Sequence, residues 1–82
     1  MLEAGAFESL ATAMHRKLRA VGQDIRDERA KKYPNTKLLL ALKVLRKRLD
    51  IGYSACVVLS KNHDEAQRER DYKTLLALYQ QT

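Results

Sequence analysis

The sequence predicts an all-α fold, a compact bundle of three to four helices that forms one domain over residues 1–82. One Pro, three Gly and no Trp stand among 82 residues rich in Leu, Ala, Lys, Arg and Glu, a composition that favours helix over strand. Apolar residues also recur at helical intervals along most of the chain. A chain of this length builds a core that is only marginally sufficient, so we expect a homodimer.

The first helix is predicted over residues 7–31. Its apolar side chains follow a spacing of three and four residues, which places them on one face of a helix. These residues are Phe7, Leu10, Met14, Leu18, Val21 and Ile25. Such a face is typical of a helix that packs inside a bundle.

A second helix is predicted over residues 36–50. Pro34 disfavours helical geometry at the residue before it, and Asn35 or Thr36 can cap the helix that follows. Four leucines share one face, while a second apolar patch lies on another side. The face holds Leu38, Leu42, Leu45 and Leu49, and the patch holds Leu40, Ala41 and Val44. A helix that is apolar on two sides is expected to be buried between neighbours.

A helix–turn–helix-like joint is predicted at residues 49–54, because Gly52 allows a tight turn and Ser54 can cap a new helix. We expect a short third helix over 55–61. The β-prone run Cys56-Val57-Val58-Leu59 leaves open a strand that pairs across a dimer.

The last helix is predicted over residues 63–80, since Asn62 and Glu65 resemble a capping box. Its first two turns are charged and should face solvent. The face that docks on the core contains Tyr72, Leu75, Leu76 and Tyr79. The alternative is one long helix from Ser54 to Tyr79.

Positive charge is concentrated in the middle of the chain. The net charge is +6, but residues 16–48 alone carry twelve Lys and Arg against three acids, a local net charge of +9. Such a segment favours a polyanionic partner, because each phosphate that it neutralises releases condensed counterions. The candidate contacts, mainly to phosphates, are Arg16, Arg19, Lys43, Arg46, Lys47, Arg48, Ser54 and Lys61.

The run Leu45-Arg46-Lys47-Arg48-Leu49-Asp50-Ile51-Gly52-Tyr53-Ser54 resembles the helix–turn–helix in the C-terminal winged-helix domain of FtsK-type DNA translocases. The resemblance implies a basic helix, an Ile-Gly-Tyr turn and a recognition helix in the major groove. It covers no more than a quarter of the chain, and no hairpin signal for a wing follows. Where that family carries Asn and Arg, this chain has Ala55-Cys56-Val57-Val58, which cannot make bidentate contacts with bases.

Other classes of function find little in the sequence. The chain has no phosphate-cradling Gly loop and no activated nucleophile, so we predict no enzyme, and Cys56, His15 and His63 lack the spacing of a metal site. No cofactor is expected. A membrane span and a signal peptide are not expected either, and a single Cys fits the cytoplasm.

The favoured hypothesis is a small DNA-binding regulator or accessory factor. The alternative is a protein-binding module, an inhibitor or adaptor that docks on a protein partner. A third possibility, ranked last, is that the first helix lies on an anionic membrane surface.

Overall fold

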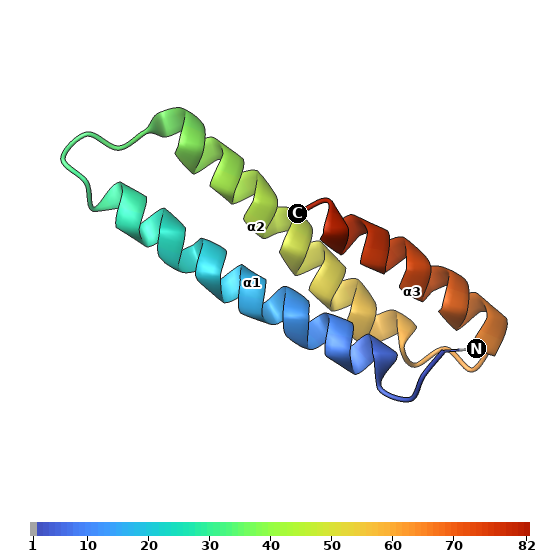
Figure 1. The fold of residues 1–82 in the computed structure, drawn as a ribbon. Helices are drawn as coiled ribbons and strands as arrows, with labels where there is room; N and C mark the ends of the chain where they lie inside the picture. The colour runs from blue at the N-terminus through green and yellow to red at the C-terminus, as the bar shows by residue number, and fades with distance from the viewer. Residues whose placement is uncertain (1) are drawn as a thin grey trace.

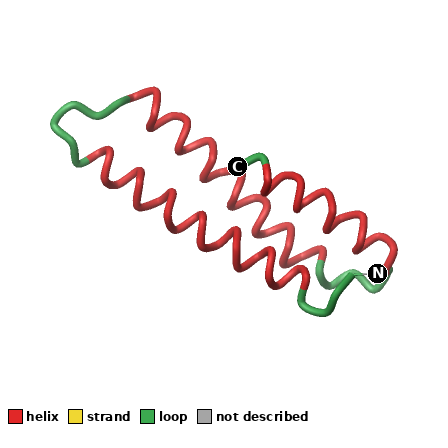
Figure 2. Tube along the Cα trace, in the orientation of Figure 1, coloured by secondary structure: helices red, strands yellow, loops and turns green. Residues whose placement is uncertain are grey.

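The computed structural model describes residues 2–82 and contains three helices, α1 (Ala6–Arg29), α2 (Thr36–Leu59) and α3 (Glu65–Gln80) (Figure 1). Within these residues no segment forms a strand (Figure 2), so the predicted all-α class is confirmed. The helices α1 and α2 form a long antiparallel hairpin, and α3 turns back along the C-terminal half of α2. The bundle is elongated, with principal extents of 51 × 17 × 17 Å.

The helix α1 forms where the apolar spacing predicted it. It runs from Ala6 to Arg29 rather than from 7 to 31. Five of the six residues of the predicted face are buried, and Leu18 is half-buried. The buried residues are Phe7, Leu10, Met14, Val21 and Ile25. The amphipathic pattern therefore identified the side of α1 that packs on its neighbours.

The connection between α1 and α2 is fixed by a buried carboxylate. The Oε1 atom of Glu28, a residue only 5% exposed, accepts a hydrogen bond of 2.8 Å from the backbone N–H of Asn35. Its Oε2 atom lies 2.7 Å from Nζ of Lys31. The side chain of Asn35 in turn caps α2 by accepting from the N–H of Leu38 at 3.1 Å, so the predicted boundary and cap are confirmed.

The predicted joint at residues 49–54 is wrong, because α2 continues unbroken from Thr36 to Leu59. The segment predicted as a separate helix over 55–61 is the end of α2, and the chain turns only after Leu59. The strand alternative is wrong because residues 55–59 are helical. The long helix from Ser54 to Tyr79 is wrong because the chain turns between Leu59 and Glu65. The run that resembles the FtsK-type helix–turn–helix thus lies inside one helix.

Gly52 serves close packing instead of a turn. A Cβ atom at this position would lie 3.1 Å from both Cε and Sδ of Met14 in α1 and 3.5 Å from Cδ2 of Leu78 in α3. The missing side chain therefore lets three helices meet at one level. In an isolated sequence this use of Gly looks the same as a turn.

The helix α3 begins at Glu65, two residues later than predicted, because Asp64 and not Asn62 is its cap. The Oδ1 atom of Asp64 accepts from the N–H of Gln67 at 3.2 Å, and Asn62 instead accepts from the N–H of Asp64 at 2.9 Å. The predicted core face is confirmed. Leu75 is buried, and Tyr72, Leu76 and Tyr79 pack around it.

The core has two parts along the bundle. Where three helices overlap, the buried residues are Phe7, Leu10, Met14, Cys56 and Leu75. Nearer the α1–α2 connection only two helices are present, and the buried residues are Val21, Ile25 and Leu49. Because α3 does not extend there, α2 is not covered on two sides. The predicted second apolar patch is therefore exposed, as is Leu38.

The two helical glycines should respond in opposite ways to substitution. Gly52→Val forces a branched side chain against Met14 and Leu78 and should lower the free energy of unfolding by about 1–3 kcal/mol. Gly22→Ala meets nothing closer than Nη1 of Arg26 at 4.0 Å and should raise it by about 0.5–1 kcal/mol. Urea unfolding followed by circular dichroism measures both. An unchanged free energy of unfolding for Gly52→Val would show that the helices do not meet this closely.

Acid should weaken the α1–α2 connection. The hydrogen bond to Lys31, and next the hydrogen bond from the Asn35 backbone, lower the pKa of Glu28 below its ordinary value. The unfolded chain therefore takes up this proton at a higher pH than the folded chain. The stabilisation is complete above the ordinary Glu pKa of about 4.3 and is lost as the pH falls through the lower, folded value.

Glu28→Gln should accordingly lower the urea midpoint of unfolding at neutral pH. The difference in midpoint from the wild type should narrow as the pH falls below the ordinary Glu pKa of about 4.3. The matched control is Asp24→Asn, which removes an exposed α1 carboxylate and should leave a gap near zero at every pH. A constant gap for Glu28→Gln would contradict a contribution from its charge.

Candidate nucleic-acid interface

Three adjoining shallow hollows follow the junction of α1 and α2. The first is lined in part by His15, Arg16, Arg19 and Tyr53. The second shares Arg19 with the first and adds Arg26 and Arg46. The third shares Arg46 with the second and adds Lys43, Lys47 and Asp50. We call the cations of this surface the basic face: Arg16, Arg19, Arg26, Lys43, Arg46 and Lys47.

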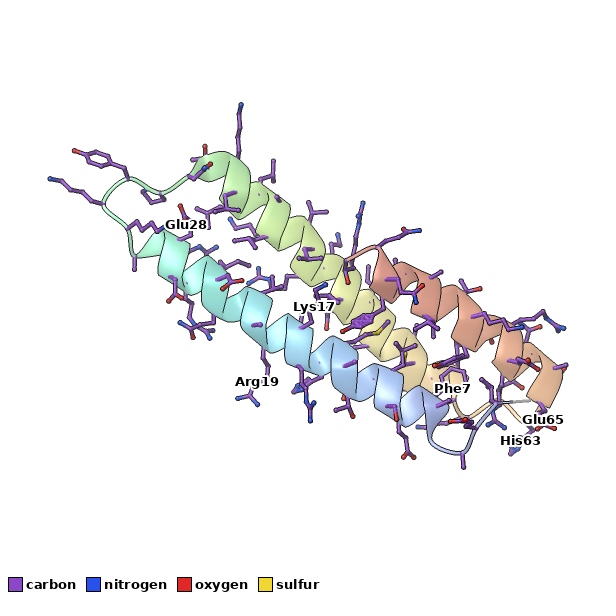
Figure 3. All side chains as sticks on the ribbon, viewed as in Figure 1. Phe7, Lys17, Arg19, Glu28, His63 and Glu65 are labelled. Atoms are coloured by element: carbon purple, nitrogen blue, oxygen red, sulfur yellow. The ribbon has the colours of Figure 1, made fainter. Side chains whose placement is uncertain are left out.

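The hairpin brings together residues far apart in the sequence. Arg19 on α1 and Arg46 on α2 line the same hollow, because the two helices run antiparallel along each other. Five of the eight predicted contacts belong to the basic face. In Figure 3 the Arg19 side chain projects from α1 away from the bundle. The face is therefore open to a large ligand.

The other three predicted contacts are not brought into these hollows. Arg48 follows Arg46 by two residues, which turns it by about 200° around α2. Ser54 is exposed and lies seven residues after Lys47, hence on the same side of α2 but about 10 Å further along. Lys61 lies in the turn beyond the end of α2.

Arg26 belongs to the basic face but was not among the predicted contacts. It stands seven residues after Arg19, two helical turns along the same side of α1, so its spacing already placed it there. Its Nη2 atom donates to Oε1 of Gln23 at 2.9 Å, and Nε2 of Gln23 donates to Oδ1 of Asp27 at 2.8 Å. The Gln23 amide thus orients the Arg26 guanidinium without neutralising its charge.

The basic face carries more positive charge than its neighbours balance. The lining residues of the three hollows include two carboxylates, Asp50 and Glu8. Within residues 2–82 no carboxylate lies within 4.0 Å of the charged atoms of any of the six cations. Their charge is consequently available to an anionic partner.

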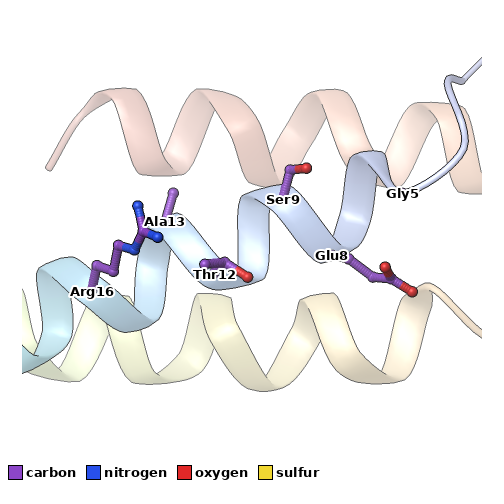
Figure 4. Close-up of a pocket in the computed structure, with 6 residues that line it drawn as sticks. All are labelled: Gly5, Glu8, Ser9, Thr12, Ala13 and Arg16. Atoms are coloured by element: carbon purple, nitrogen blue, oxygen red, sulfur yellow. The ribbon is translucent and has the colours of Figure 1, made fainter.

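At one end of the basic face, small side chains of α1 leave room beside Arg16. Figure 4 shows Arg16 and Glu8 at opposite ends of a hollow that Ser9, Thr12 and Ala13 line between them. Glu8 therefore opposes an anion at this end of α1. Further along, Arg19, Arg26 and Arg46 share a hollow whose lining residues include no acid.

Two rings are among the side chains that line the first hollow. The His15 and Tyr53 rings lie 5.5 Å apart between centroids, tilted by 44°, and Tyr53 also packs against the buried cluster. Tyr53 therefore anchors α2 on α1. Tyr33, in contrast, is 83% exposed, and Nζ of Lys32 lies 5.6 Å from its ring centroid.

Past the predicted joint, the side chain of Cys56 lies inside the bundle. Cys56 is 1% exposed, its Sγ lies 3.8 Å from Sδ of Met14, and burial raises the pKa of its thiol. Cys56 is therefore a buried apolar residue. Since it lies inside the bundle, it cannot reach a base or react readily as a thiolate.

The part of the chain that the structure describes contains no group of three or more His, Cys, Asp or Glu side chains placed to hold a metal ion. None of its three helices is long and apolar enough to cross a membrane.

Comparison of the chain with protein-family models, with curated proteins and with solved structures gives no match. The function is therefore inferred from the surface of the chain itself.

Proposed function

We propose that this chain is a nucleic-acid-binding protein, a DNA-binding regulator or accessory factor, that contacts the phosphates of a duplex through its basic face. One observation carries the proposal: six cations from two helices line adjoining hollows, and among the described residues no carboxylate lies within 4.0 Å of their charged atoms. Arg16 and Arg26 are about 15 Å apart along α1. A duplex presents about one negative charge per 1.7 Å of its axis, so several phosphates lie within reach.

The mode of binding follows from the side chains available. Arg and Lys side chains that contact phosphates fix the orientation of the protein, while sequence is read by side chains that reach base edges. After Gly52, Cys56 is buried, and the exposed Val57 and Val58 carry no polar group, so these side chains supply no such readers. We therefore propose binding with little dependence on base sequence and with strong dependence on salt.

The basic face should account for most of the affinity for duplex DNA. Arg19→Glu/Arg46→Glu should weaken binding about tenfold for each arginine replaced near 0.1 M salt, and should reduce the slope of log K against log salt by about two. Fluorescence anisotropy with a short labelled duplex measures both quantities. Two duplexes of unrelated sequence should bind within a few-fold of each other.

The matched control is Arg70→Glu/Lys73→Glu on α3, which changes the net charge equally but lies outside the basic face. It should retain most of the wild-type affinity. Equal reductions in affinity for the two double variants would show that binding depends on net charge and not on the basic face. The absence of wild-type binding at low salt would overturn the proposal.

A protein-binding module is the second candidate function, and one observation favours it. Large apolar side chains are exposed along α2, where they contribute nothing to phosphate contacts. Binding of a protein partner to these apolar side chains would not change in Arg19→Glu/Arg46→Glu.

A further inference from the structure

The exposed apolar side chains of the chain are gathered on one helix. Of the described residues, Tyr33 is the single large exposed hydrophobic outside α2. The others are Leu38, Leu40, Val44, Ile51, Val57 and Val58. Exposed apolar residues are normally scattered over a surface, and a contiguous group marks an interaction site.

Four of these residues form a narrow stripe, which we call the α2 seam: Leu40, Val44, Ile51 and Val58. At about 100° per residue they lie within about 40° of one another around the helix. Leu49, which packs on α1, lies on the opposite side of α2. Val44, Ile51 and Val58 are spaced by seven residues, the repeat that keeps a row of side chains facing a partner helix.

The exposed area of the chain also suits a dimer. A folded monomer of 9.4 kDa is expected to expose about 5,000 Å². This chain exposes 6008 Å², an excess of about 1,000 Å² over that expectation. The elongated shape of the bundle, 51 × 17 × 17 Å, contributes to this excess, and a stable interface of standard size would remove about 800 Å² of it from each partner.

We propose that the α2 seam pairs with the α2 seam of a second copy in antiparallel orientation. Charge decides the direction. The first half of α2, residues 36–48, carries five cations and no acid, whereas residues 49–59 carry Asp50 alone. A parallel pair sets the two basic halves side by side, and an antiparallel pair sets each against the nearly uncharged half of the other.

The spacing of the seam fixes the register. With Ile51 on the twofold axis, Val44 meets the partner's Val58, and the β-branched residues form three successive layers over about 21 Å of helix. Lys47 lies at the edge of the seam and is then level with the partner's Ala55, whose small side chain leaves room for the lysine stem to reach solvent. This inference does not depend on nucleic-acid binding.

The mass in solution tests the pairing. Light scattering after size exclusion should give about twice 9.4 kDa for the wild type, which is the mass of a dimer. Ile51→Lys should give about half of that mass, because pairing would bury the lysine charge in the interface. Ile51 is 57% exposed in the single chain. The control Ala77→Lys adds the same charge at an exposed site of α3 and should remain dimeric. A monomeric wild type throughout a dilution series, or a dimeric Ile51→Lys, would overturn the proposal.

Cross-linking tests the orientation with variants that keep the seam nearly intact. In a Cys56→Ala background, Ile51→Cys should link to itself with a short thiol cross-linker. Val44→Cys should link to Val58→Cys when the two variants are mixed, and neither should link to itself, because equivalent residues then lie about 21 Å apart. Self-linking of Val44→Cys would indicate a parallel pair and contradict the proposed direction.

Discussion

The contact between Gly52 and Met14 governs how the helices of this chain meet. The position of a missing Cβ atom, 3.1 Å from two atoms of the Met14 side chain, brings α2 against α1 at the level where Leu78 of α3 also arrives. The buried thiol of Cys56 lies one turn further along α2 and touches the same methionine. How closely the three helices approach one another thus depends on one small residue, Gly52, and one flexible residue, Met14.

This close approach also sets the width of the basic face. Arg19 and Arg46 can line one hollow only if the backbones of α1 and α2 run close together and in a fixed register. The Glu28 carboxylate fixes that register at the other end of the hairpin, where it ties Lys31 to the start of α2. Fold and proposed function therefore rest on the same interhelical contacts.

Local pattern predicted the helices and their inner faces, as the stripes on α1 and α3 demonstrate. It failed at Gly52, because a glycine that ends a helix and one that admits a neighbour look alike until the residue opposite, Met14, is known. The candidate site divides in the same way. The spacing of Arg26 was readable from the sequence, whereas the pairing of Arg19 with Arg46 required the register of the hairpin. The exposure of the α2 seam could be known only once the sides of α2 that α1 and α3 cover were known.

The shortness of α3 gives the bundle two ends of unequal thickness. Around Phe7, Met14 and Leu75 three helices exclude water, whereas around Val21 and Leu49 only two do. Backbone amides at the thin end can open through a local fluctuation that leaves the thick end folded. The connection between α1 and α2 is consequently where we expect the native hairpin to fray first, with amides that exchange with solvent ahead of those beside Met14.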